Sequence, residues 1–214
     1  EPVADDGTEK PRLRVRLRGF SWFSSEAGSE RRRRPTDAVL LAASLVGLGI
    51  LLPVAPGPSD FDTNLTEVLK QLPLVLQWLF EGAYALGSIW AAVLLLAPLF
   101  VRGRRSLSGL LLISAALSFG AAVLVGGVAG TGWSDSLGSL LGTSTSPVFT
   151  AVRLAVVTAV LVTASPYLSH PARLVGRCLL VLMSVAAVAV EAAYPIGVVA
   201  AMLVGAVTAT VLHL

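Results

Sequence analysis

Charged side chains are scarce in this sequence. Only 14% of its 214 residues are Asp, Glu, Lys or Arg, whereas 55% are hydrophobic, and the mean hydropathy is +0.79. An ordinary soluble domain carries roughly a quarter of its residues as charged side chains. The composition therefore excludes an ordinary soluble globular domain and indicates an integral membrane protein.

Cysteine and histidine are also rare. The single cysteine, Cys178, excludes a disulfide within the chain, and a lone cysteine in an apolar run is usually an inert small hydrophobe. The only histidines are His170 and His213. No helix carries two carboxylates at a short spacing that would hold a metal ion. We therefore expect neither a metal site nor a cofactor.

Arginine is concentrated ahead of the first apolar run. Residues 1–34 are polar and contain scattered Pro, Gly and Ser, so they predict a basic cytoplasmic tail that is disordered or lies on the membrane surface. Such positive charge is attracted to anionic headgroups. Base-stacking platforms and a folded basic module are absent, so we expect no nucleic-acid partner. The arginines of the tail are Arg12, Arg14, Arg16, Arg18, Arg31, Arg32, Arg33 and Arg34.

Several apolar runs follow the tail, and each can be compared with the ~20 helical residues that cross a hydrocarbon core. Residues 35–214 are predicted to form an all-α, polytopic membrane helix bundle of about six transmembrane helices. Small residues that recur inside the runs allow the helices to pack tightly. The predicted spans cover about 38–53, 74–101, 107–128, 148–166, 174–192 and 195–213.

Loop charges predict the orientation of this bundle. In a six-span count, the arginines in the loops and at the nearby ends of the spans fall on one side, which the positive-inside rule makes cytoplasmic. Both termini then lie in the cytoplasm, and we expect a multi-pass protein of the plasma (inner) membrane of a bacterium. The arginines of the cytoplasmic side are Arg31 to Arg34, Arg102, Arg104, Arg105, Arg173 and Arg177, and the opposite loops carry Asp60, Asp62, Glu67 and Asp135.

Three ionisable residues interrupt the apolar runs. Glu81, Arg153 and Glu191 all fall in the predicted outer half of the membrane, where each would cost a few kcal/mol if it faced lipid. One interpretation is a polar pocket that opens to the outside, in which Arg153 binds a lipid phosphate and Glu81 or Glu191 is its counter-ion. A structural ion pair, or an arginine that extends to the headgroups, is the alternative, and the sequence leaves both open.

The last signature of a known family is visible in "SVAAVAVEAAYPIGVVAAMLVGAV". Residues 105–214 resemble the type-2 phosphatidic acid phosphatase family, whose third signature is S-R-x-x-x-x-x-H-Y-P-x-D-V. The Tyr194-Pro195 pair is retained. The family's phosphate-binding Arg, nucleophilic His and orienting Asp are replaced by Ala187, Ala193 and Gly197.

The other two signatures of that family are reduced in the same way. Pro147 of the P-S-G-H signature is kept, but Val148, Phe149 and Thr150 follow it. The K-x6-R-P signature has no counterpart, because no Lys or Arg lies between Arg105 and Arg153. The resemblance implies a catalytically degenerate, phosphatase-like membrane domain that is not an enzyme.

The arginine-rich tail with "RRPTDAVLL" is also similar to the N-terminal membrane region of large actinobacterial proteins. Those proteins continue into a kinase-like domain and a lysylphosphatidylglycerol-synthase-like membrane domain, which implies further domains in a longer chain of the cell envelope.

We therefore expect a non-catalytic domain that binds an anionic phospholipid or a polyprenyl phosphate, or docks a protein partner, at its outer face. Tyr194 and Trp133 complete the candidate site of Arg153, Glu81 and Glu191; Trp133 and Asp135 belong to a Gly/Ser/Thr-rich segment that we predict to be a flexible loop. A structural subunit of a membrane complex stays open, as does a lipid phosphatase or transporter that uses unconventional residues.

Overall fold

The structure is a computed structural model that describes residues 35–54, 60–70, 73–100, 105–141 and 151–213. These residues form eight α-helices and two short 3-10 helices, and no β-strand occurs among them. The predicted all-α class is therefore confirmed. The predicted tail of residues 1–34 and its arginines lie outside the described residues.

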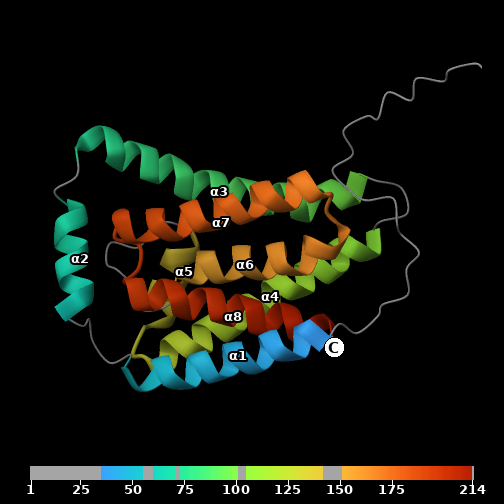
Figure 1. Cartoon of the computed structure of the whole chain (residues 1–214), viewed down its shortest axis with the longest axis horizontal. Coiled ribbons are helices and arrows are strands. Elements are labelled where there is room, and N and C mark those ends of the chain that lie inside the picture. Colours follow the sequence, from blue (N-terminus) through green and yellow to red (C-terminus); the bar gives the residue numbers. More distant parts are fainter. Residues whose placement is uncertain (1–34, 55–59, 71–72, 101–104, 142–150, 214) are drawn as a thin grey trace, which may run out of the picture.

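The longer helices run side by side along the bundle, and consecutive ones run in opposite directions (Figure 1). Proline occupies the first position of α1 and of α8, where the missing N–H costs nothing and the fixed φ suits a helix start. The helices of this set are α1 (Pro35–Leu51), α3 (Leu74–Phe100), α4 (Arg105–Val128), α6 (Val152–Ala164), α7 (His170–Ala189) and α8 (Pro195–His213).

Length and composition support four membrane spans in the described part of the chain. These are Val75–Pro98, Ser106–Val128, His170–Ala189 and Pro195–His213. The runs predicted at 38–53 and 148–166 are also apolar, but they form α-helices of 17 and 13 residues, which are shorter than the ~20 residues of a span. The prediction of a membrane protein is confirmed. By helix length, the described residues support four spans, whereas the sequence predicted about six.

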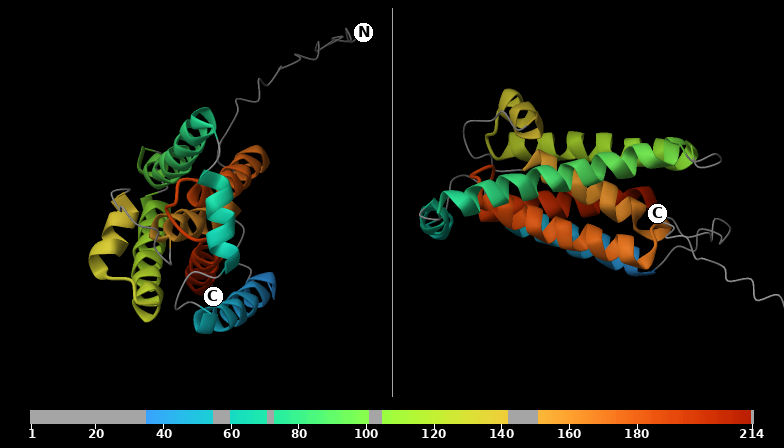
Figure 2. Two further views of the ribbon diagram at one scale, coloured as in Figure 1. Left: turned by 90° about the vertical axis from the view of Figure 1, so that its left-hand side faces the viewer. Right: turned by 90° about the horizontal axis from the view of Figure 1, so that it is seen from above.

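Two further helices lie at one end of the bundle, which we call the α2 end (Figures 1 and 2). The helix α2 (Asp60–Lys70) lies across this end, and α5 (Trp133–Leu141) contacts α4 and α6. The prediction of a flexible loop around Trp133 is wrong. Trp133, Leu137, Leu140 and Leu141 recur at helical spacing, and this apolar stripe gives even a Ser- and Gly-rich segment a face to pack.

The helix α6 lies at the centre of the bundle. It contacts α3, α4, α5, α7 and α8, and ten of its thirteen residues are buried. The end-on view in Figure 2 shows it surrounded by the other helices. Because protein and not lipid surrounds α6, its length does not have to match the thickness of a bilayer.

Close packing of small residues holds α6 in place. A Cβ atom added to Gly205 of α8 would lie 2.5 Å from the carbonyl oxygen of Ala155 and 2.7 Å from Cβ of Thr158, so the two backbones are in direct contact. On another side of α6, the hydroxyl groups of Ser114 and Thr163 share a buried hydrogen bond of 2.8 Å. The predicted tight packing through Gly, Ala and Ser is confirmed.

Candidate functional site

The start of α6 lies inside the bundle and not at its end. The helices α6 and α8 run in the same direction (Figure 1), and Gly205 of α8 packs on residues 155 to 159 of α6. Measured from these contacts, α8 begins roughly 5 to 10 Å nearer the α2 end than α6 does, at 1.5 Å per residue. Ala151 and Val152 are 0% and 1% exposed.

Among the residues that the structure describes, the N-cap position of α6 provides no side-chain cap. The N-cap residue, Ala151, makes no capping hydrogen bond, and no acidic residue lies in the first turn. The first N–H groups of a helix have no partner within the helix, and they give its start a partial positive charge. A buried helix start of this kind is a potential anion site.

Arg153 adds a full positive charge to this turn. Its guanidinium carbon lies 4.9 Å from the centre of the Tyr84 ring on α3, a cation–π contact that contributes about 0.5–2 kcal/mol. Arg153 itself is only partly buried. The tyrosine ring therefore holds the guanidinium beside the start of α6 while part of the side chain stays accessible.

Tyr84 is the residue that sequence reasoning missed. Its side chain is 7% exposed, and its buried hydroxyl has no hydrogen-bond partner in the structure. An unpaired buried hydroxyl costs about 1–3 kcal/mol. An apolar run gives no signal that singles out this tyrosine, because its importance comes only from its position under Arg153.

The two carboxylates predicted as counter-ions lie toward the same end of the bundle as Arg153. Glu81 precedes Tyr84 by three residues on α3 and is exposed, and Glu191 lies in the turn between α7 and α8 and is partly buried. The contact of the Arg153 guanidinium that the structure describes is with the Tyr84 ring. The pairing with Glu191 stays a prediction.

Glu191 has an unusual backbone conformation. Its φ of 58° lies in the left-handed region, which usually requires glycine after a helix. The N–H of Ala192 donates to the carbonyl of Ala187 at 2.9 Å, and the N–H of Glu191 donates to that of Val188 at 3.1 Å. These two bonds form the Schellman motif that ends α7, with Glu191 at the glycine position.

Asp62 of α2 joins that helix to the bundle. The side chain is 1% exposed, and its carboxylate oxygen accepts a hydrogen bond of 3.4 Å from the backbone N–H of Ile196. Ile196 is the second residue of α8, so a carboxylate from a distant part of the sequence caps this helix. The sequence indicated only that Asp62 is a loop charge.

Tyr194 and Trp133 also lie toward the α2 end. Tyr194 directly precedes α8, with its side chain partly buried. Trp133 begins α5, and its ring packs edge-on against Phe119 of α4, with 5.9 Å between the ring centres. Trp133 is 60% exposed. The described contacts of Trp133 are thus with α4 and not with Arg153.

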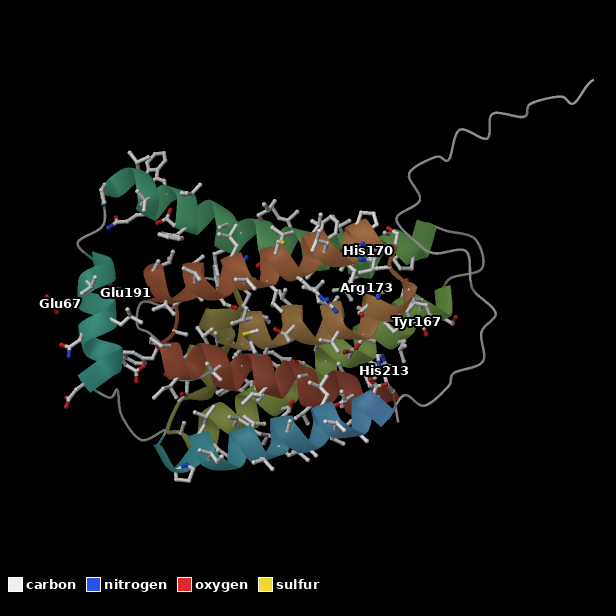
Figure 3. The ribbon with its side chains drawn as sticks, in the orientation of Figure 1. Glu67, Tyr167, His170, Arg173, Glu191 and His213 are labelled. Atoms are coloured by element: carbon white, nitrogen blue, oxygen red, sulfur yellow. The ribbon has the colours of Figure 1, made fainter. Side chains whose placement is uncertain are left out.

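The acidic side chains labelled in Figure 3 lie at one end of the bundle, and the histidines and the arginine labelled there lie at the other. Glu67 and Glu191 lie at the α2 end, and His170, Arg173 and His213 lie at the other end, which we call the His170 end (Figure 3). The guanidinium of Arg173 donates a hydrogen bond of 3.3 Å to the carbonyl of Leu168 there. The predicted separation of both histidines from Arg153 is confirmed.

Small residues occupy the positions at which the resemblance in the sequence led us to look for catalytic side chains. Ala187 and Ala193 are 0% and 2% exposed and contribute no functional group, while Pro147 to Thr150 lie outside the described residues. The described residues contain no cluster of three or more His, Cys, Asp or Glu that could hold a metal ion. No family model, no curated protein and no solved structure matches this chain.

Proposed function

We propose that this chain is a non-catalytic membrane domain that binds the phosphate group of a phospholipid or polyprenyl phosphate at the recessed start of α6. One observation carries the proposal. Arg153 lies in a first helical turn that has neither an acidic residue nor a side-chain cap, next to a buried hydroxyl without a partner.

The first turn of α6 carries positive charge and no acidic residue of its own. A helix start is equivalent to about half an elementary charge, and a nearby anion stabilises it by about 0.3–2 kcal/mol. A cation in the same turn has the opposite effect, so Arg153 raises the energy of the empty site. An anion that contacts both Arg153 and the first N–H groups of α6 would be stabilised by the guanidinium charge and by the partial charge of the helix start. Membrane proteins with helices that begin inside a bundle bind anionic groups in this way.

The absence of catalysis is part of the proposal. Phosphohistidine chemistry needs a nucleophile, a proton-transfer group and fixed cations around the phosphoryl oxygens. The two histidines are at the His170 end (Figure 3), and alanine occupies the family positions of the nucleophile and of one cation. Arg153 therefore supports binding but lacks the partners for transfer.

We also propose that the α2 end faces the outside of a bacterial inner membrane. Arg105 and Arg173 lie in the first turns of α4 and α7, which begin at the His170 end (Figure 1). Asp60, Asp62 and Glu67 belong to α2. Positive charge is retained on the cytoplasmic side of a membrane, which supports this orientation.

The test uses the full chain in detergent, titrated with phosphatidylglycerol and followed by native mass spectrometry. Arg153→Gln is expected to raise the Kd about tenfold, since a hydrogen bond to a charged group contributes about 1.5–3 kcal/mol. Arg177→Gln is the matched control, because Arg177 is an exposed guanidinium on α7 and its loss should leave the Kd unchanged. Equal Kd values for the wild type and Arg153→Gln would contradict the proposal.

A further inference from the structure

We propose that the preferred ligand is a phospholipid whose phosphodiester carries a primary amine, with the phosphate at Arg153 and the ammonium group at Glu81. This inference rests on the proposed function and specifies the headgroup that the same site takes. It makes Glu81 the residue that determines headgroup specificity.

Glu81 lies one helical turn from the phosphate site. It precedes Tyr84 by three residues on α3, a spacing at which side chains are neighbours on a helix surface. At 1.5 Å per residue, this spacing places Glu81 about 4.5 Å nearer the α2 end than Tyr84. A short aminoalkyl ester that extends from a phosphate at Arg153 toward that end would therefore reach the carboxylate.

The surroundings of Glu81 are unfavourable for an isolated carboxylate. The residue is exposed on an apolar span, and Trp78, which lies one turn before it on α3, is 76% exposed. Carboxylates on the lipid side of a span are costly and usually have a partner that belongs to their function. The ammonium group of a lipid headgroup would be such a partner.

The buried hydroxyl of Tyr84 supports the placement of the phosphate. It is more than nine-tenths buried and has no hydrogen-bond partner, and its ring is the surface on which Arg153 lies. A phosphate oxygen at Arg153 could accept a hydrogen bond from this hydroxyl. Tyr84 therefore links the phosphate subsite on α6 to Glu81 on the same helix, α3.

The net charge at the α2 end favours a ligand without a large negative charge. Glu81 joins five other carboxylates there, and Arg153 and Lys70 are the cations among the described helices of this end. A phosphate monoester with two negative charges meets repulsion from this set, whereas a zwitterionic phosphodiester meets none overall. The carboxylates are those of Asp60, Asp62, Glu67, Glu81, Asp135 and Glu191.

The experiment compares four probes on the full chain by native mass spectrometry: phosphatidylethanolamine, phosphatidylcholine, phosphatidylglycerol and phosphatidic acid. We expect phosphatidylethanolamine to bind about tenfold more tightly than the other three, since its amine can donate hydrogen bonds to a carboxylate. Glu81→Gln should remove this preference, and because it removes a carboxylate that repels an anion, it should not weaken the binding of phosphatidylglycerol. Glu81→Asp should keep part of the preference.

Glu67→Gln is the matched control, because Glu67 is an exposed carboxylate on α2 that should not affect the preference. Thermal unfolding of each variant shows that it is folded. If Arg153→Gln binds all four lipids as the wild type does, the proposed function is wrong and this inference with it. If binding depends on Arg153 but the four lipids bind equally, or Glu81→Gln keeps the preference, the proposed function stands and this inference is wrong.

Discussion

An alanine at position 205 tests how closely α6 and α8 pack. The added Cβ would lie 2.5 Å from the carbonyl oxygen of Ala155, 2.7 Å from Cβ of Thr158 and 3.0 Å from the backbone nitrogen of Ala159. Two of these three atoms belong to the backbone, so they cannot move without moving α6. Overpacking of this kind costs about 1–3 kcal/mol. Gly205→Ala is therefore expected to lower the free energy of unfolding by that amount.

The assay is unfolding of the full chain in detergent, with Gly120→Ala as the matched control. Gly120 lies in the middle of α4, and a Cβ added there meets nothing within 4 Å. Alanine in place of glycine inside a helix stabilises by about 0.5–1 kcal/mol when space allows. The two glycine-to-alanine changes should therefore have opposite signs.

Lipid binding provides a second measurement on the same variant. The depth of the α6 start follows from the contact of Gly205 with α6, so a displaced α6 moves Arg153 relative to Tyr84. Gly205→Ala should weaken phosphatidylglycerol binding, and Gly120→Ala should not. If Gly205→Ala stabilises the chain as much as Gly120→Ala does, α6 and α8 do not pack at this distance, and the recessed site is misplaced.

Two further predictions concern the turn after α7 and the orientation of the bundle. Glu191→Gly should raise the free energy of unfolding by about 1 kcal/mol, because the left-handed conformation at φ 58° costs an L residue about 1–2 kcal/mol. A loss of stability in the same unfolding assay would show that the Glu191 carboxylate stabilises the chain by more than this backbone conformation costs. The second prediction uses intact cells that express the chain with Cys178→Ser as background. A membrane-impermeant maleimide should label Glu67→Cys on α2 and spare His170→Cys at the start of α7, since Glu67 and His170 are exposed at opposite ends of the bundle. Labelling of His170→Cys alone would reverse the proposed orientation.

Helix positions were largely predictable from the sequence. The predicted run 107–128 agrees with α4 at Arg105–Val128, and the run 195–213 coincides with α8 at Pro195–His213. Proline and charged residues mark these ends, and such local signals need no knowledge of the fold. The same rules missed α5, because its apolar stripe is short and lies among Gly and Ser.

The partners of the charged residues were not predictable. Sequence reasoning named Arg153 but not the ring of Tyr84 on which the structure places it, and its pairing with a carboxylate stays a prediction. It treated Asp62 as a loop charge, whereas the structure buries it at the start of α8. Both contacts join residues far apart in the sequence, and no local pattern encodes such a distance.

The sequence by itself determined that this is an all-helical membrane protein. In lipid, backbone N–H and C=O groups need hydrogen-bond partners within the protein, and long apolar runs meet this need by forming helices. It also determined that one arginine, Arg153, lies deep in an apolar run. The tertiary structure decided that α6 is central and starts inside the bundle, since this depends on how Gly205 lets α8 approach α6. The packing of these two helices turns an isolated arginine into a site with a helix start, a buried hydroxyl and a neighbouring carboxylate.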